Sequence, residues 1–564
     1  MNKASIHLII TAIAILVFLP GLGVTPLFDW DELNFAESAR EMWLTKYFYY
    51  VQVGFEPFWE KPPLFIWLQS AFLGLFGDHT FVYRLPNALA GIVTVNMAYH
   101  IGYYLGRRTL GVFWALAMAF TFAPMLYFKL GIIDPVFNLF IFLAVWHWYR
   151  ITRCESEESR PHWHYFLVGV FIGLAVLTKG QVALLLLGIV VLLITAYRGR
   201  WQDIFSARIF IAMLGCLLIV GTWILQVYNH LGPQFFASFI EYQLELVKGQ
   251  IPWHNQPWFY HVVVLLFLCF PAAALALPYL FQRGEEDFGL ESWHTVMRTL
   301  FWVVLVIFSI VTTKIIHYSS LCWFPLTYFA GYHTYLIHTN RGQNHWSQKV
   351  TLFITALGLL TVMLLLPLVF GRTELPHWAT PHLDAYTKGL FDGQEPWSFT
   401  ALIPAMLMIL LVFPWLIKNF LHNQWHPGKL FIGVSAVALS SYFFLLPPAE
   451  RLLQKELTQT VVRETEPKNQ IVETHGFRSY ALYFHGKTQP ENMQGVWLTD
   501  TFVLHRSQHN PYPLQEAKRV WIKDANHHDN ARLITKSTYV ADRYFRYQFN
   551  LIDSQGAYFV WQRR

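Results

Sequence analysis

Charged residues are scarce in this chain. Asp, Glu, Lys and Arg make up 13% of its 564 residues, while hydrophobic residues make up 55%. Soluble domains carry about 25% charged residues, so an ordinary soluble protein is excluded. The formal net charge of +6 is modest for a chain of this length, and we therefore expect no nucleic-acid partner.

Cysteine and several catalytic motifs are also rare or missing. Three of the four cysteines (Cys216, Cys269 and Cys322) lie in apolar segments, and Cys154 lies in a short polar loop. Their spacing supports neither a disulfide framework nor a cysteine metal site. The chain has no glycine-rich phosphate loop, no nucleophile elbow and no His-Glu-x-x-His motif, so nucleotide hydrolysis, acyl transfer and metalloproteolysis lose support.

Long apolar runs are what the chain has in place of these features. Many approach the ~20 residues that a helix needs to cross hydrocarbon. Hydropathy predicts about thirteen spans, at residues 6–27, 81–105, 109–128, 132–150, 164–178, 181–197, 207–228, 258–282, 297–313, 316–338, 350–371, 398–418 and 429–446. A further apolar piece, 62–77, opens with two prolines and is predicted to be a re-entrant or interfacial helix.

The positions of the basic residues orient these spans. If the N-terminus lies inside, arginines such as Arg107, Arg108, Arg198 and Arg200 fall in inner loops, and the outer loops mostly hold single lysines. This bias follows the positive-inside rule. We therefore predict a multi-pass protein of the cell inner membrane, surrounded by membrane lipids.

The composition changes after Pro447 and Pro448, where the chain becomes polar. Short alternating runs there resemble strands: 480–485, 495–499 and 518–522. We predict a transmembrane domain at 1–446, which includes a first periplasmic loop at 28–80, and a soluble periplasmic domain at 447–564. The predicted fold class is an all-α polytopic membrane protein with a small C-terminal α/β domain.

A charged cluster follows the first span directly. Segment 31–42 opens with Asp31 and Glu32, and Glu60-Lys61 comes one loop later. Charge beside hydrocarbon is costly, so this cluster is a functional-site hypothesis. A positioned carboxylate can deprotonate an acceptor hydroxyl or amine, and Lys61 can hold a phosphate leaving group. The structural alternative for the acidic pair is stabilisation of a helix N-terminus by the dipole.

Two further charged residues are expected on the same outer face. Asp134 precedes Pro135 at the start of a span and is either a second active-site carboxylate or an ordinary N-cap with proline at N1. Lys179 interrupts an apolar run at an outer turn. It is either a phosphate ligand or an interfacial lysine that extends toward water.

The outer hairpin at 313–318 contains three groups that can donate to phosphate or sugar oxygens: Lys314, His317 and Tyr318. An aromatic belt residue is the alternative for Tyr318. His254 lies in the loop at 229–257, and a single histidine is weak support for a metal ligand.

Taken together, these motifs resemble the GT-C glycosyltransferases. The best match within them is the aminoarabinose lipid A transferases and their relatives, kin of the protein O-mannosyltransferases. The resemblance covers the whole chain. It rests on these residues: 31–42, 60–62, Asp134, 178–180 and 314–318.

The resemblance implies a polyprenyl-phosphate-linked sugar donor, transfer on the outer face of the inner membrane, and inversion at the anomeric carbon. By motif, Asp31 matches the catalytic carboxylate and Lys61 the lysine that holds the donor phosphate. Glu60 and His254 match a carboxylate and a histidine that can join around a metal ion, so a divalent metal is a candidate cofactor. We expect a monomer.

Two departures leave the sugar and the acceptor open. Asn34 stands where the aminoarabinose enzymes usually carry arginine, and His317 is typical of less characterised relatives. One rival interpretation is O-glycosylation of Ser or Thr in a protein acceptor. The other is a lipid-linked sugar transporter, which should place charges near the bilayer midplane and show inverted repeats. Here the charges gather at one face and no repeat is visible.

Overall fold

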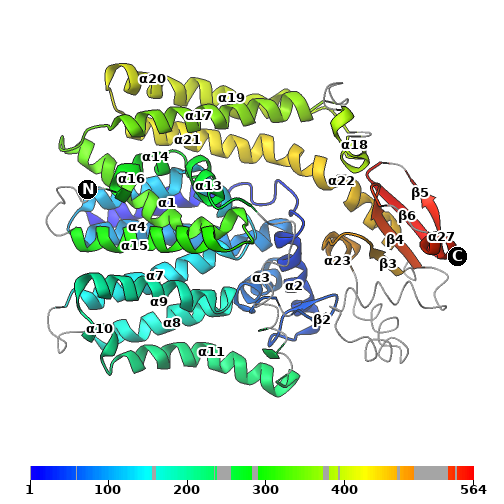
Figure 1. Ribbon diagram of the computed structural model, residues 1–564, viewed down its shortest axis with the longest axis horizontal. Coiled ribbons are helices and arrows are strands. Elements are labelled where there is room, and N and C mark those ends of the chain that lie inside the picture. The colour runs from blue at the N-terminus through cyan, green and yellow to red at the C-terminus, as the bar shows by residue number, and fades with distance from the viewer. Residues whose placement is uncertain are drawn as a thin grey trace.

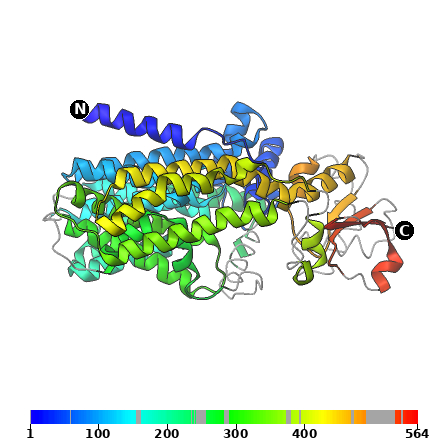
Figure 2. The ribbon, with the colours of Figure 1, turned by 90° about the horizontal axis from the view of Figure 1, so that it is seen from above.

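The computed structural model describes residues 2–563 apart from 59, 155–160, 234–235, 238–239, 241–255, 282–289, 373–379, 392–393, 467–470, 488–530, 540–542 and 555. A bundle of roughly parallel helices forms most of the molecule, and a small sheet domain lies against one end of it (Figures 1 and 2).

Helices occupy every segment that hydropathy predicted to span the membrane. They are α1 (Lys3–Phe18), α4 (Thr80–Tyr104), α5 (Arg108–Phe120), α6 (Phe122–Tyr127), α7 (Asp134–Thr152), α8 (His162–Lys179), α9 (Val182–Arg198), α11 (Ile209–Leu231), α13 (Tyr260–Leu268), α14 (Ala272–Phe281), α15 (Glu291–Ile310), α16 (Trp323–His338), α17 (Trp346–Leu365), α19 (Ile403–Leu407), α20 (Phe413–His422) and α21 (Pro427–Ser440).

Length and composition qualify six helical stretches of the described chain as spans: His162–Lys179, Ile209–Leu231, Glu291–Ile310, Trp346–Phe370, Phe399–His422 and Pro427–Thr465. The all-α multi-pass architecture predicted from the sequence is therefore confirmed. The number of thirteen crossings stays a prediction.

Two of the predicted spans are broken helices, and the breaks meet. The chain leaves the helical path at Thr121, between α5 and α6, and again between α13 and α14. The Phe122 N–H donates to the Phe270 carbonyl at 3.1 Å. Irregular backbone is tolerated at membrane depth where it is buried in protein and its polar groups find partners, and this contact supplies one.

Small residues let neighbouring helices approach closely. Gly102 on α4 faces Gly111 on α5 so tightly that a Cβ on Gly102 would lie 2.2 Å from the Gly111 Cα. Contacts of this kind between helix backbones are typical of membrane bundles, because lipid offers no hydrophobic drive for helix association.

The first outer loop forms a compact layer on one end of the bundle (Figure 1). It consists of α2 (Asp31–Thr45), a two-residue hairpin of β1 (Gln52–Val53) and β2 (Glu56–Pro57), and α3 (Leu64–Phe76). The carboxylate of Glu41 on α2 accepts from the N–H groups of Gly54 and Phe55 at 2.6 and 2.7 Å, which fixes the hairpin against the helix.

The last bundle helix is longer than one membrane crossing requires. From α21 the helical path passes through a π-helical turn, η7 (Ser441–Leu445), into α22 (Leu446–Thr465). At 1.5 Å per residue, the 39 residues from Pro427 to Thr465 reach well past a hydrocarbon core of about 30 Å. The change in composition at Pro447 falls within this one helical stretch, and the domain boundary there stays a prediction.

Beyond α22 the sheet has the strand order β3-β4-β6-β5, formed by β3 (Ile471–Thr474), β4 (Ala531–Lys536), β6 (Tyr558–Arg563) and β5 (Phe549–Asp553). The β3–β4 pair is parallel, and the other pairs are antiparallel. Two short helices accompany it, α23 (Ala481–Gly486) and α27 (Arg543–Gln548).

The prediction of a strand at 480–485 is wrong, because these residues begin the helix α23. Four consecutive residues from Ala481 to Phe484 are buried, so the apparent alternation of the sequence did not reflect one buried face. The other two predicted strands, 495–499 and 518–522, lie outside the described residues.

A buried ion pair joins the outer loop to the bundle. The guanidinium of Arg84 on α4 donates to both carboxylate oxygens of Glu32, at 2.8 and 2.7 Å. Its remaining N–H groups donate to the carbonyls of Leu22, Thr25 and Pro26. The two side chains are 0% and 2% exposed. A charge in such surroundings persists only when it is paired and hydrogen-bonded.

Removing one partner should leave the other charge buried without compensation. We expect Arg84→Met and Glu32→Gln each to lower the free energy of unfolding by about 3–5 kcal/mol. The measurement is reversible unfolding of the purified protein in mixed micelles.

Lys487→Ala is the control, because it removes an ion pair with Asp78 whose side chains are 49% and 40% exposed. We expect it to cost about 0–1 kcal/mol. An equal cost for the exposed pair and the buried pair would contradict the role given to Arg84.

Candidate active site

Two carboxylates and an imidazole meet where the outer loop joins the bundle. Asp31 is the first residue of α2, Asp134 the first residue of α7, and His317 belongs to the short helix η2 (Ile316–Cys322). The His317 Nε2 atom lies 3.6 Å from Asp31 Oδ2 and 3.6 Å from Asp134 Oδ2. These distances are too long for direct hydrogen bonds, but a protonated imidazole there attracts both carboxylates.

The two carboxylates differ in accessibility. The Asp31 side chain is 43% exposed, whereas that of Asp134 is 3% exposed. A proton acceptor has to reach the group that it deprotonates. Asp31 is therefore the carboxylate of this pair that an acceptor molecule can approach, and Asp134 serves the cluster from within the protein.

Lys179 pairs with the buried carboxylate. Its Nζ atom donates to Asp134 Oδ1 at 2.6 Å and lies 4.7 Å from the centre of the Tyr318 ring. Asp134 Oδ2 has no hydrogen-bond partner among the described residues. Asp134 does not cap α7 with its side chain, since the N-cap is Ile133. The N-cap alternative is therefore wrong, and Lys179 is an internal ion-pair partner.

Glu32 does not join this cluster. The N–H groups of Phe28 and Gly131 also donate to its two oxygens, which the Arg84 guanidinium already holds. With its lone pairs taken up in this way, the carboxylate has no route to a substrate proton. The geometry replaces the catalytic role predicted for Glu32 with a structural one.

Lys61 lies near the cluster and is half-buried. It is within electrostatic range of the Asp134 carboxylate. Within the described part of the chain, Lys61 forms no hydrogen bond and no ion pair, unlike Lys179. An ammonium group without a partner at the edge of the bundle is available to a phosphate.

Lys314 belongs to the outer hairpin at 313–318, and its side chain is buried. Its side chain donates to the Val311 carbonyl at 2.8 Å. Two side-chain contacts hold the end of this hairpin in place. Ser319 contacts His261 at 3.1 Å, and Ser320 accepts a hydrogen bond from Asn138 at 2.7 Å. These contacts fix η2, and with it His317 and Tyr318, over the start of α7.

Metal binding stays a prediction. The carboxylate of Glu60 accepts a hydrogen bond from the Arg478 guanidinium at 3.1 Å. The charged partner described for this carboxylate is therefore an arginine side chain. The described residues contain no group of three His, Cys, Asp or Glu side chains that could hold a metal ion. His254, the predicted second ligand, lies outside the described residues.

Two residues that anchor this region, Asp29 and Arg478, left no signal in the amino-acid sequence. Asp29 accepts from the Ser479 hydroxyl at 2.5 Å and from the Tyr480 N–H at 2.9 Å. Burial raises the pKa of Asp29, and these donors and the Trp30 N–H oppose that rise. A third missed residue, Arg84, did leave a signal, since an arginine inside an apolar span marks a buried partner.

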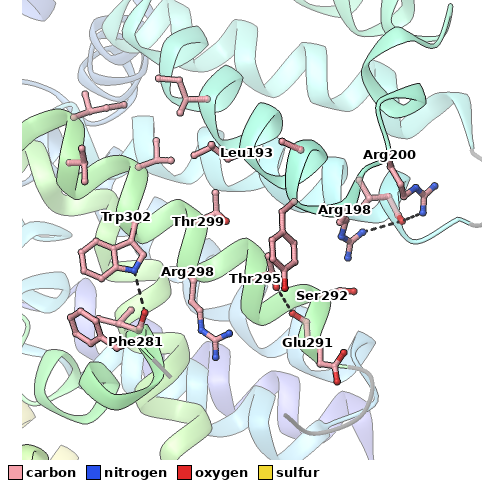
Figure 3. Close-up of a pocket in the computed structure, with 18 of the residues that line it drawn as sticks. Leu193, Arg198, Arg200, Phe281, Glu291, Ser292, Thr295, Arg298, Thr299 and Trp302 are labelled. Atoms are coloured by element: carbon pink, nitrogen blue, oxygen red, sulfur yellow. Dashed lines mark hydrogen bonds between the residues drawn. The ribbon is translucent and has the colours of Figure 1, made fainter. Parts of the chain in front are cut away.

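A well-formed cavity in the described part of the chain lies elsewhere. It has a volume of about 1370 Å³ and is lined mainly by α9 and α15, with Arg198 and Arg200 at one end (Figure 3). These arginines donate to the Thr152 carbonyl at the C-terminal end of α7, opposite the end where Asp134 begins that helix. None of the predicted site residues lines it, so this cavity is separate from the candidate active site.

The chain is similar in sequence to known transferases. Residues 60–225 match the family model of the dolichyl-phosphate-mannose-protein mannosyltransferases. The undecaprenyl phosphate-alpha-4-amino-4-deoxy-L-arabinose arabinosyl transferase of Enterobacter sp. (strain 638) is 26% identical over 396 residues, which cover 67% of this chain and 68% of that protein. The enzyme of the same name, numbered 1, from Pseudomonas fluorescens (strain Pf0-1) is 24% identical over 431 residues, covering 72% and 68%.

The fold has a solved counterpart. The crystal structure of ArnT from Cupriavidus metallidurans bound to undecaprenyl phosphate superimposes with a TM-score of 0.69 at 16% sequence identity, covering 100% of this chain and 98% of that one. The chain is a multi-pass membrane glycosyltransferase with the GT-C fold. Its sequence relatives include aminoarabinose transferases, and part of the chain matches the protein mannosyltransferase family model.

Proposed function

We propose that this enzyme transfers a sugar from undecaprenyl phosphate to a lipid acceptor such as lipid A, on the periplasmic face of the inner membrane. The observation that carries the proposal is that His317 lies 3.6 Å from both the accessible carboxylate of Asp31 and the buried carboxylate of Asp134. Lys61, which forms no ion pair with the described residues, interacts electrostatically with Asp134. The names of the similar transferases and the undecaprenyl phosphate bound in the structure of similar fold support this donor.

The proposed reaction is a single displacement. An acceptor hydroxyl attacks the anomeric carbon while Asp31 takes its proton. The new glycosidic bond forms as the bond between that carbon and the phosphate oxygen breaks. The electron pair leaves with the phosphate of the lipid carrier, and the configuration at the anomeric carbon inverts.

Charge stabilisation falls to the lysines. Lys61 holds the departing phosphate, and stabilisation of developing charge by fixed groups is usually the largest catalytic contribution. Lys179 has one N–H committed to Asp134, and its other N–H groups can support the phosphate together with the Tyr318 hydroxyl. Lys314 supports the hairpin from below. His317 keeps Asp31 oriented by attraction from 3.6 Å.

A periplasmic orientation is supported by the charge pattern. The predicted site residues Asp31, Asp134 and Lys179 lie at one end of the bundle, and the arginine pair Arg198 and Arg200 lies at the other. Arginine-rich ends face the cytoplasm in inner-membrane proteins. The gathering of charge at one end also argues against a transporter, whose binding charges lie near the midplane.

A protein acceptor is the second candidate, because the matching family model describes transfer of mannose to proteins. Mass spectrometry of a deletion strain distinguishes the two acceptors. We expect lipid A to lose a sugar substituent in the deletion strain, while the glycopeptides of its envelope proteins stay unchanged. Loss from glycopeptides with unchanged lipid A would contradict the lipid acceptor and favour the protein acceptor.

The catalytic assignment predicts two inactive variants. We expect Asp31→Asn to lower kcat by about 10²–10⁴-fold because the base is lost. We expect Lys61→Ala to lower kcat/KM by about 10²–10³-fold because a charge-stabilising donor is lost. The measurement is transfer from a synthetic undecaprenyl-phosphate sugar by purified protein in nanodiscs.

Lys388→Ala is the matched control, since Lys388 is exposed on the separate helix α18 (Ala385–Gly389). It should retain wild-type activity. All variants should elute as folded protein in size-exclusion chromatography. Full activity in Asp31→Asn or Lys61→Ala would overturn the assignment.

A further inference from the structure

We propose that the C-terminal domain positions the catalytic loop, by which we mean the first outer loop at 28–80. Within this domain, Arg478 is a positioning residue for the donor-phosphate lysine Lys61. This inference rests on the proposed function, in which Lys61 binds the carrier phosphate. It gives the domain after α22 a part in donor binding that its sheet topology alone does not suggest.

The segment 478–480 contacts the catalytic loop at two places. Arg478 reaches Glu60, the residue directly before Lys61, at 3.1 Å. Ser479 and Tyr480 hold Asp29, two residues before Asp31, through both of its carboxylate oxygens. Three consecutive residues of the C-terminal domain therefore fix the backbone beside the proposed base and beside the proposed phosphate ligand.

A second anchor strengthens the hold on Asp29. The N–H of Asp29 donates to the side chain of Gln454 on α22, and the Gln454 amide donates to the Leu27 carbonyl at 3.2 Å. Gln454 in turn donates to Glu450 at 2.8 Å. Helix α22 and the segment 478–480 therefore both form hydrogen bonds with the same short stretch of the outer loop, around Asp29.

The stretch between these anchors is strained. Trp30 has φ = 74° and ψ = −102°, which is unusual for a bulky side chain. Strained residues persist only where surrounding contacts determine the backbone. Here Asp29 is fixed by the C-terminal domain and Glu32 by Arg84, while Trp30 and Asp31 between them remain 52% and 43% exposed.

The Arg478–Glu60 pair is less exposed than the other ion pair between the C-terminal domain and the outer region. In its pair with Glu60, the side chains are 34% and 16% exposed, whereas the neighbouring Lys487–Asp78 pair is 49% and 40% exposed. Both pairs link the C-terminal domain to the first outer loop and its end. Only the Arg478 pair lies next to a proposed ligand of the donor.

The test compares donor binding and turnover in matched variants. Undecaprenyl phosphate binding is measured directly on the full-length protein in nanodiscs, and KM and kcat are measured with the sugar-linked donor. We expect Arg478→Ala to raise both the Kd and the KM about tenfold, an effect within the usual range for coupled neighbours, with a smaller change in kcat. Arg478→Lys should restore most of the affinity, and Lys487→Ala should behave as wild type.

The variant Glu60→Gln removes the acidic partner of the Arg478–Glu60 ion pair. If the pair positions Lys61, Glu60→Gln weakens binding as Arg478→Ala does, and the double variant is no worse than either single variant. This arm also decides the question if Arg478→Ala fails to fold. Tighter binding in Glu60→Gln would overturn the inference, because it would mean that Arg478 only screens the charge of Glu60.

Wild-type affinity in Arg478→Ala would also overturn it, as would losses in the two single variants that add in the double variant. Failure of the wild-type protein itself to bind undecaprenyl phosphate would instead refute the proposed function. A general loss of folding is separated by thermal unfolding, in which Arg478→Ala and Lys487→Ala should differ little.

Discussion

The buried ion pair between Arg84 and Glu32 is the constraint on which the active end of the molecule depends. Arg84 binds the carboxylate of Glu32 and three carbonyls that follow α1, and Glu32 also receives the N–H of Gly131 just before α7. One interaction therefore joins the end of the first span, the start of α2, the helix α4 and the approach to Asp134. Because charges in this setting cannot be left unpaired, the relative placement of Asp31 and Asp134 is fixed by the same pair that holds the loop.

The acidic residues that follow the first span have different roles at different positions. Asp29 and Glu32 are anchors, one bound by the C-terminal domain and the other by Arg84. Trp30 and Asp31 between them face outward on a strained backbone. A reactive carboxylate held between two fixed neighbours loses little freedom when a substrate binds, which is how preorganised sites lower the cost of reaching the transition state.

The sequence predicted the helical bundle and the end at which the charges gather. Both follow from the cost of charge in hydrocarbon, and the structure brings Asp31, Asp134, Lys179 and His317 together accordingly. Their catalytic roles stay predictions. The sequence could not separate Asp31 from Glu32, because only the fold shows which of two adjacent carboxylates meets Arg84.

The contacts of the C-terminal domain were beyond sequence reasoning for a different reason. Asp29 and Ser479 are 450 positions apart, and no local periodicity or motif reports such a contact. The strand predicted at 480–485 failed because alternating apolar residues also occur in a short helix buried on several sides, as α23 is. Hydrophobic periodicity identifies a helix or a strand reliably only when one face of that element is exposed to solvent.

The most direct test of the account is a structure of this protein with undecaprenyl phosphate bound. The proposed mechanism requires the phosphate to lie within hydrogen-bonding distance of Lys61, with Asp31 facing the position of the sugar. A phosphate bound in the cavity between α9 and α15, beside Arg198 and Arg200 and away from Lys61, would contradict it.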